Sequence, residues 1–598
     1  MLVGVCKRIT VLSGVVHLVS GAIFTDPSFV YSNKYDYIVA GAGTAGCVIA
    51  SRLTEDPAIK VLVIEAGLFD NGPDSNIIHT PILAGQGVGT EYDWKYVTTN
   101  QIGLNNQSIA YPRGFVVGGS SALNSMVYAR GPSEDFDRLA SVSQDNRWTW
   151  DSLQPFIFRN ERHVPDWSNR NVEGEYNPAV HGTGPLMTSL TANKTRLDHR
   201  VFEAVDELGD KFFYNEDLNS GYTLGFGWLR STIGNGARSD SSSAFLTPAL
   251  NIRANIDLLL QTHVVKVTDM ENRNDFRTVQ LSQSDEGLIY NITALKEVIL
   301  SAGSIGTPQI LMLSGIGDVE HLSSLGLTGK VNLPNVGRNM QDQAVLGIQY
   351  LVNDSSLQDV MTNNTLLQTA LTDWGATQTG FAASNVLINT QGFLRLDSDA
   401  PPLSLYPDPS AGENSPHISF AFEDFFVPNP NQSAPNSGHW ITASVVVQSP
   451  TSRGSISLLS TSSFDHPAID PAFLTTDFDL QATIQAVHTL QKFFNASAFE
   501  NYIISPHPDA ANLTDDADIE TYARLWSNTL HHPVATAKMS ASDNDGVVRS
   551  DLCVHGTTGL RVVDASILPY APGGFPQAQV YIVAERGSVF IQESGCGL

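Results

Sequence analysis

Hydrophobic positions near the start of the chain follow two periodicities, which together predict a strand–helix–strand unit. Residues 35–40 (Tyr-Asp-Tyr-Ile-Val-Ala) and 60–64 (Lys-Val-Leu-Val-Ile) are short apolar runs, as expected for buried strands. Residues 47–53, between these runs, carry apolar side chains at helical spacing. Farther along, residues 256–260 predict another strand.

The middle of the chain, residues 346–450, predicts a sheet strand but holds no recognisable chemical motif. Large apolar residues alternate with their neighbours over residues 441–447, and residues 399–416 are rich in proline and serine, which predicts a loop that could act as a lid. Seven aromatic residues lie near one another in sequence. We interpret them as hydrophobic core; the alternative is an aromatic-lined pocket for a flat, apolar substrate. They are Trp374, Phe381, Phe420, Phe422, Phe425, Phe426 and Trp440.

Composition indicates a large globular protein and argues against several classes of partner. The 598 residues include 34 Lys and Arg against 61 Asp and Glu, which gives a formal net charge of −27. Hydrophobic residues make up 42% of the chain, enough to build an ample core. The negative charge argues against nucleic acid and against anionic lipid, because both need Lys and Arg. The length suggests at least two domains, or one domain with an inserted lobe.

The first 24 residues predict a secretory signal peptide. Lys7 and Arg8 precede an apolar run of about 16 residues, which ends in small residues. The alternative is a membrane anchor, but a spanning helix needs roughly 20 apolar residues. We therefore expect a protein that is secreted, or that resides in the secretory pathway or vacuole, without a membrane anchor.

Cysteines and glycosylation sequons are compatible with that compartment. Cys6 would leave with the signal, and Cys47, Cys553 and Cys596 would remain, so at least one is unpaired or bonds between chains. No CxxC or Cys/His spacing occurs, so we expect no metal site. Eight Asn-x-Ser/Thr sequons are present, a number that chance alone can give. They begin at Asn106, Asn193, Asn291, Asn353, Asn363, Asn431, Asn495 and Asn512.

A glycine-rich turn follows the first predicted strand and matches GxGxxG. Gly41 permits the tight turn, Gly43 lets the backbone approach a pyrophosphate, and Gly46 allows the helix to pack closely on the strand. The helix N-terminus offers N–H groups to phosphates. Glu65, 19 residues after Gly46, can accept hydrogen bonds from ribose hydroxyls. The unit therefore predicts NAD or FAD and disfavours NADP, whose 2′-phosphate a carboxylate repels.

Further blocks of sequence distinguish between these cofactors. Residues 111–131, 303–317, 333–342, 532–536 and 559–566, in this order, resemble the glucose–methanol–choline (GMC) flavoprotein oxidoreductases. The resemblance covers about residues 35–592, and the first two blocks match the family's two signatures. It is closest to fungal aryl-alcohol oxidases and secondary-metabolite enzymes. It implies an α/β fold, with a doubly wound FAD-binding domain and an interleaved α+β substrate lobe built on an antiparallel sheet.

The resemblance also implies a division of the chain. Residues 1–24 would be the signal peptide, and residues 25–345 the FAD-binding domain with some segments of the substrate lobe. Residues 346–450 would form the substrate domain. Residues 451–592 would carry the catalytic histidine and return to the FAD domain.

FAD is the cofactor that the resemblance implies. Some relatives attach FAD covalently through a histidine, but Leu123 stands at that position, so we expect non-covalent FAD. The glycine loop that begins at Gly118 would approach the flavin closely. Thr44, Ala45, Glu65 and Ala66 would meet the ADP half; Trp94, Asn124, Ser125, Met126 and Val127 would sit by the flavin; Val265 would touch adenine; and Asp564, Ala565, Pro576 and Gln577 would approach the ribityl chain and ring.

The catalytic pair of the family is only half present. A base that removes a hydroxyl proton should titrate near neutrality, which favours histidine. His532 fits the family's His-x-x-x-Thr setting, although His531 precedes it and a register of one stays open. The second residue, usually histidine or asparagine, should follow 43 positions later, and Phe575 stands there. A phenyl ring can neither accept a proton nor hydrogen-bond an alkoxide.

Three functions remain open. We expect an FAD-dependent enzyme that oxidises a primary or secondary alcohol, an aromatic or polyketide-like metabolite, with His532 as base and dioxygen or another acceptor as electron sink. The runner-up is a redox-neutral cyclase or dehydratase of secondary metabolism with FAD as a structural group, since versicolorin B synthase belongs to this family. The third is a non-catalytic flavin-binding protein.

Overall fold

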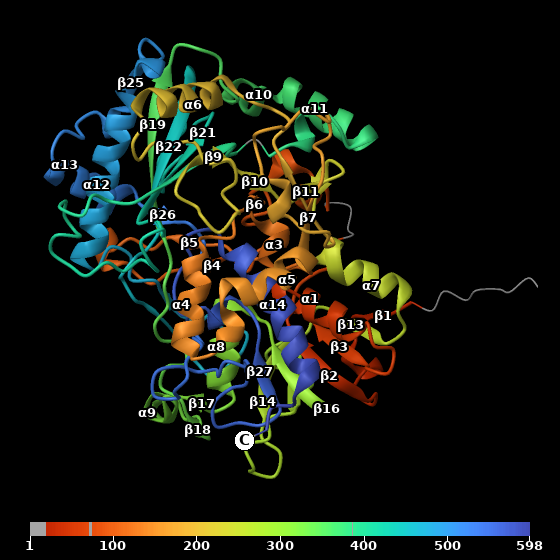
Figure 1. The fold of residues 1–598 in the computed structure, drawn as a ribbon. Helices are drawn as coiled ribbons and strands as arrows, with labels where there is room; N and C mark the ends of the chain where they lie inside the picture. Colours follow the sequence, from red (N-terminus) through yellow and green to blue (C-terminus); the bar gives the residue numbers. More distant parts are fainter. Residues whose placement is uncertain (1–19, 71–74, 386, 598) are drawn as a thin grey trace, which may run out of the picture.

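The protein folds around two large sheets whose strands come from interleaved segments of the chain (Figure 1). The computed structural model describes residues 20–70, 75–385 and 387–597. The predicted α/β fold is confirmed, with a mainly parallel sheet and an antiparallel one.

The first sheet is mainly parallel and has eight strands, in the order β1-β13-β3-β2-β16-β15-β14, with β27 also paired to β16. All pairings are parallel except those that add β15 and β14. Every residue of β3 and β13 is buried, because helices and loops cover both faces of the sheet. The strands are β1 (Ala22–Phe24), β2 (Tyr35–Ala40), β3 (Val61–Ile64), β13 (Ile256–Leu259), β14 (His263–Thr268), β15 (Thr278–Ser282), β16 (Tyr290–Leu300) and β27 (Leu560–Val562).

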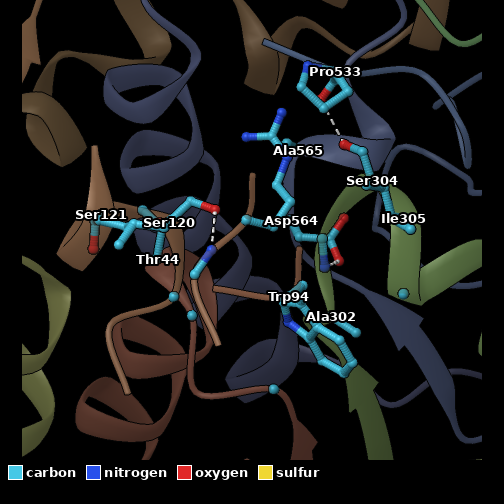
Figure 2. Close-up of a pocket in the computed structure, with 18 of the residues that line it drawn as sticks. Thr44, Trp94, Ser120, Ser121, Ala302, Ser304, Ile305, Pro533, Asp564 and Ala565 are labelled. Carbon is cyan, nitrogen blue, oxygen red and sulfur yellow. Dashed lines mark hydrogen bonds between the residues drawn. The ribbon is translucent and has the colours of Figure 1, made fainter. Parts of the chain in front are cut away.

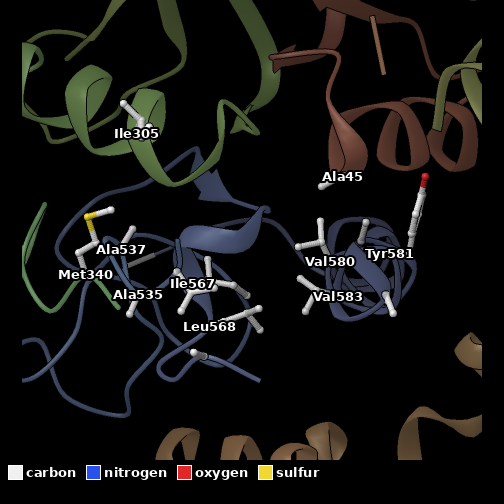
Figure 3. Packing of buried hydrophobic residues seen from close by; sticks show 14 of the residues in the cluster. Ala45, Ile305, Met340, Ala535, Ala537, Ile567, Leu568, Val580, Tyr581 and Val583 are labelled. Atoms are coloured by element: carbon white, nitrogen blue, oxygen red, sulfur yellow. The ribbon is translucent and has the colours of Figure 1, made fainter. Parts of the chain in front are cut away.

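Two helices from opposite ends of the chain pack together on this sheet. The helix α1 (Thr44–Leu53) is the one predicted after the glycine turn, and α14 (Pro576–Glu593) is nearly the last element. Val580 and Val583 of α14 lie in the shared hydrophobic core, with Ala45 of α1 near Val580 (Figure 3). Arg52 of α1 forms an ion pair at 2.6 Å with the buried Glu585 of α14. The sheet therefore needs both ends of the chain.

The second sheet is antiparallel, in the order β25-β19-β22-β21-β20-β9, with β26 also paired to β19. The strand predicted from alternation at residues 441–447 is the centre of this sheet, and α12 (Asp477–Phe494) packs against it. The strands are β9 (Gly225–Trp228), β19 (Ala344–Val352), β20 (Thr390–Leu394), β21 (Ile418–Glu423), β22 (His439–Val447), β25 (Ile503–Pro506) and β26 (Asn528–Thr529).

Two of the expected boundaries differ from the structure. Residues 22–24, assigned to the signal peptide, form the edge strand β1, which pairs in parallel with β13. Most of the predicted signal, residues 1–19, lies outside the described residues. The antiparallel sheet also takes β25 and β26 from beyond residue 450, whereas its strand β9 comes from residues 25–345, where some segments of the substrate lobe were expected. Strand pairing joins segments that are distant in sequence, which local patterns do not reveal.

The middle of the chain is mostly core. Phe420, Phe422 and Phe426 are almost fully buried, and none of the seven aromatic residues lines the main cavity, so the aromatic-lined pocket is wrong for them. Residues 399–416 do form a loop, but they do not line the cavity either. Arg395 holds this loop through the carbonyl groups of Gly412 and Ser415.

Candidate active site

A cavity of about 460 Å³ lies at the carboxyl ends of the parallel strands. Gly41, Glu65 and Ser301 follow β2, β3 and β16, and all three line it. Asp564 lines it from the segment after β27 (Figure 2). Carboxyl ends of parallel strands are the usual ligand site of doubly wound folds. Residues next to the antiparallel sheet, such as Ile388 and Leu530, also line it.

The GxGxxG turn has the shape that a pyrophosphate needs. Gly41 adopts φ +104°, and a Cβ on Gly46 would lie 2.0 Å from the Gly41 carbonyl oxygen, so both glycines are required for packing. A Cβ on Gly43 would meet nothing closer than 3.8 Å, because this position faces the open cavity. No side chain caps the first turn of α1, so its N–H groups are free to bind phosphate. These residues fit a dinucleotide.

Glu65 is held rigidly at the tip of β3. Its Oε2 accepts from the N–H of Ala42 and its Oε1 from the N–H of Gly67, both at 2.8 Å. Burial raises the pKa of this carboxyl to about 7, although the two N–H groups oppose that shift. The remaining lone pairs are available to accept hydrogen bonds from ribose hydroxyls.

Three distant segments meet at the other side of the cavity. Asn124 Nδ2 donates to Gln577 Oε1 at 2.7 Å, which joins the second glycine loop to the start of α14. The carboxylate of Asp564 accepts from the Gly303 N–H at 2.9 Å and from the Thr307 hydroxyl at 2.6 Å. Four of the five blocks that carried the family resemblance therefore line one cavity.

Most of the predicted cofactor residues line this cavity. Gly46 and Gly118 do not, but they shape the turns: the Gly118 N–H donates to the Ala42 carbonyl at 2.7 Å. The lining residues among the predictions are Gly41, Gly43, Thr44, Ala45, Glu65, Ala66, Trp94, Asn124, Ser125, Val127, His532, Asp564, Ala565, Phe575, Pro576 and Gln577.

Two further residues predicted to contact the cofactor do not line the cavity. Met126 is fully buried in a small apolar cluster and does not line the cavity. Val264 lines the cavity where Val265 was expected, because the register of β14 shifts between residues 264 and 266. Trp94 lines the cavity, and its ring centroid lies 5.5 Å from that of His263. His263 also lines the cavity, and the sequence pattern gave it no role.

His532 lines the cavity with one ring nitrogen fixed from behind. Its Nδ1 lies 2.6 Å from Oε1 of Gln343. The Nε2 of Gln343 faces the carbonyl groups of Gln448 and Pro572, each at 2.9 Å, so the amide must present its oxygen to the imidazole. Nδ1 of His532 therefore carries the proton, and Nε2 keeps a free lone pair. The sequence analysis did not identify Gln343, which directly follows the family-like block at residues 333–342.

Burial, with smaller effects from two neighbouring side chains, keeps His532 neutral. Desolvation, with smaller effects from His531 and Arg113, holds the pKa of His532 well below its usual value. The backbone N–H of His532 donates to Asp342 at 2.8 Å, and Asp342 also accepts from Thr529 at 2.7 Å. A neutral imidazole with a free Nε2 is equipped to accept a proton.

Phe575 faces His532 with its ring edge-on. The ring centroids are 5.2 Å apart and the planes are inclined by 82°. Phe575 packs with Val127, Leu218 and Phe393, and Ile388 packs against this group. An apolar wall therefore occupies the position where the family resemblance implies a second polar catalytic residue.

The described residues add neither a metal site nor a membrane-spanning helix to this picture. Within residues 20–70, 75–385 and 387–597, no group of three or more His, Cys, Asp and Glu side chains could hold a metal ion. In the same part of the chain, no helix combines the length and hydropathy that crossing a bilayer requires.

Comparisons with known proteins agree with this arrangement. Sequence models of the GMC oxidoreductases match residues 35–345 and 450–584. Pyranose dehydrogenase 3 of Leucoagaricus meleagris is 36% identical over 94% of this chain and 93% of its own length. Dehydrogenase eriK of Hericium erinaceus is 34% identical over 98% and 99%. A variant of formate oxidase from Aspergillus oryzae RIB40 superposes with a TM-score of 0.86, at 27% identity over 96% and 98%.

Proposed function

The chain belongs to the GMC oxidoreductases, which are FAD-dependent enzymes, and on that premise we propose that it oxidises a primary or secondary alcohol with His532 as the base. The observation that carries the proposal is the fixed imidazole of His532, whose free Nε2 belongs to a cavity-lining side chain. The cofactor is FAD.

The reaction removes two hydrogens from the alcohol. His532 Nε2 accepts the hydroxyl proton, and the C–O single bond becomes a carbonyl. When bound, FAD supplies the acceptor for the carbon-bound hydrogen and its electron pair. Gln343 and Asp342 hold the ring and the backbone of His532 in place during the transfer. Dioxygen or another small-molecule acceptor completes the cycle.

Apolar walls near His532 favour an aromatic or polyketide-derived alcohol. Phe575, Ile388, Leu530 and Val127 line this end of the cavity. A sugar carries a hydroxyl on nearly every carbon, and each needs a partner when it is buried. One named relative is a pyranose dehydrogenase, so the proposal of an aromatic or polyketide-derived alcohol rests on the apolar lining residues.

Leu123 supports non-covalent binding of FAD. It is almost fully buried and lines the cavity at the position where some relatives attach the cofactor. A Leu side chain has no nucleophilic atom. Denaturing the holoprotein should therefore release all of its FAD into solution.

Phe575 favours a second candidate, a redox-neutral cyclase with FAD as a structural group. His532 would then act as acid or base for ring closure, and no hydride would leave the substrate. A flavin-binding protein without catalysis is the third.

One anaerobic experiment separates these functions. Purified holoprotein is mixed with a panel of aromatic and polyketide-derived alcohols, and the flavin absorbance near ~450 nm is followed. Loss of absorbance with an aldehyde or ketone product supports alcohol oxidation. A product without loss of absorbance contradicts it in favour of the cyclase, and neither signal across the panel leaves the binding protein.

We also propose that the protein is secreted or resides in the secretory pathway. A disulfide joins Cys553 to Cys596, and such bonds persist in oxidising compartments. Cys47 is a buried free thiol, so one cysteine is unpaired, as the odd count predicted. Several sequons, including Asn106, Asn291 and Asn512, lie at the surface. N-terminal sequencing and glycan mapping of the natural protein would test this: an intact Met1 would overturn it.

A further inference from the structure

A second histidine reaches the same cavity beside His532. His531 lines the cavity and is accessible within it, while protein atoms enclose it on its other sides. Its ring lies 6.4 Å from that of Tyr111, with the planes inclined by 73°. The hydrogen bonds of His532 to Gln343 and Asp342 do not involve this side chain.

The backbone of His531 is held in an unfavourable conformation. Its φ is +65°, a backbone conformation that residues other than glycine seldom adopt. The His531 N–H donates to the Thr529 hydroxyl at 2.8 Å, and the Ser304 hydroxyl donates to the Pro533 carbonyl at 2.6 Å (Figure 2). Hydrogen bonds thus hold residues 531 and 533, and these bonds offset the backbone strain at His531. Strain of this kind tends to persist where a side chain must be aimed at a functional site.

The surroundings of His531 keep its imidazole neutral. Burial, with a smaller effect from the Arg113 guanidinium, lowers the pKa of this imidazole to about 3. Arg113 lines the cavity, and its Nε and one Nη have no hydrogen-bond partner among the residues that the structure describes. A neutral imidazole keeps one N–H group for donation, whereas Phe575 has none.

We propose that His531 is a further catalytic residue, which donates a hydrogen bond to the alcohol oxygen and so supplies the contact that Phe575 cannot make. His532 accepts the hydroxyl proton, and the N–H of His531 stabilises the negative charge that develops on the oxygen. No atom is exchanged with His531. This inference rests on the proposed alcohol oxidation and names the second group that acts on the same hydroxyl.

The test uses three variants of the full-length holoprotein. His531→Phe removes the hydrogen-bond donor and keeps an aromatic ring. Phe575→His places a donor at the position that faces His532. The double variant combines both changes. His488→Phe, the same replacement on α12 at a residue that does not line the cavity, is the matched control. FAD content is measured for each, together with the rate of anaerobic flavin bleaching by an alcohol that the wild type oxidises.

We expect His531→Phe to lose about 10²–10³ of the bleaching rate, which is the usual value of one such donor, with FAD content unchanged. The double variant should regain at least tenfold over His531→Phe. A rate for His531→Phe within threefold of the wild type would overturn the inference, and so would a double variant no faster than the single one.

Equilibrium binding keeps this test separate from that of the proposed function. Benzyl alcohol is titrated into each holoprotein by calorimetry, because the hydrogen bond from His531 forms whether or not oxidation follows. We expect His531→Phe to weaken this binding about tenfold. If no alcohol bleaches the wild-type flavin, the proposed oxidation fails, and the binding result alone decides on His531: unchanged affinity in His531→Phe overturns the inference.

Discussion

The Oε1 atom of Gln343 lies 2.6 Å from Nδ1 of His532, and this single contact decides which nitrogen of the imidazole can act as a base. Gln343 is fully buried, and its own amide is fixed by the Gln448 and Pro572 carbonyls. The tautomer of His532 is therefore set by side chains and loops that join the antiparallel sheet, not by the substrate.

Replacing Gln343 by Glu should change the pH dependence of the reaction. A carboxylate next to Nδ1 favours the protonated imidazole, so the pKa of His532 rises. The neutral base is lost as pH falls through that pKa, and the acid limb of the bleaching rate should move to higher pH. Gln432→Glu, in the same lobe but away from His532, is the control. Identical profiles for the wild type and Gln343→Glu would contradict the assignment of the base.

Replacing His532 by Ala should abolish alcohol oxidation while FAD stays bound. The imidazole supplies the proton acceptor, whereas the GxGxxG turn and Glu65 hold the cofactor from the other side of the cavity. Anaerobic bleaching and FAD content measure the two effects separately. Residual turnover at the wild-type rate would refute the role of His532.

Replacing Phe575 by His should increase the rate of alcohol oxidation. The ring centroids of Phe575 and His532 are 5.2 Å apart, so a donor at position 575 would reach the substrate hydroxyl that His532 deprotonates. The gain is at most about 10²–10³, because His531 already supplies part of this function in our proposal. Phe575→Leu, which adds no donor, is the control, and an equal gain in that variant would show that ring size rather than hydrogen bonding matters.

Two glycines of the same turn should respond differently to alanine. A Cβ on Gly46 would lie 2.0 Å from the Gly41 carbonyl, so Gly46→Ala should destabilise the protein with or without FAD. A Cβ on Gly43 has 3.8 Å of space, so Gly43→Ala should leave the stability of the FAD-free protein unchanged and weaken FAD binding. Thermal unfolding and FAD titration measure both. Normal FAD affinity in Gly43→Ala would mean that the pyrophosphate lies elsewhere.

Glu65 should make the FAD-free protein less stable as pH rises. Its pKa is raised from 4.5 to about 7 in the folded state, so the folded protein retains the proton that the unfolded chain loses between these values. This group's contribution to the free energy of unfolding should fall by up to about 3 kcal/mol across that window. Urea unfolding of the wild type and of Glu65→Gln at several pH values isolates it. A stability difference that does not vary with pH would contradict the raised pKa.

Breaking the Cys553–Cys596 disulfide should destabilise the carboxyl-terminal part of the first sheet. The bond closes a loop of 43 residues, which corresponds to about 3–4 kcal/mol of loop entropy. The Cys596 backbone N–H also donates to the buried Glu297 of β16 at 2.6 Å, so the bond anchors the chain end to that sheet. Cys596→Ser should lower the melting temperature, with Cys47→Ser as the control; an unchanged melting temperature would contradict this role.

The sequence alone determined the elements whose cause is local. Burial on a strand or helix face depends on the spacing of apolar residues along the chain, so such a pattern specifies its own conformation. Examples are the apolar runs at residues 35–40 and 60–64, the glycine turn between them and the alternation at residues 441–447. The motif order was likewise enough to identify the family and FAD. It also placed His532 and Phe575 at one site, and the two rings are in contact.

Only the tertiary structure decided contacts between distant segments. The edge strand β1, the bulge that puts Val264 in place of Val265, and the burial of Met126 depend on which strands pair and which side chains meet. The same is true of Gln343, whose sequence carries no sign that it orients His532 across 189 residues. A spacing pattern fixes how one element is built, whereas the direction of a catalytic nitrogen depends on hydrogen bonds that exist only after the whole chain has packed.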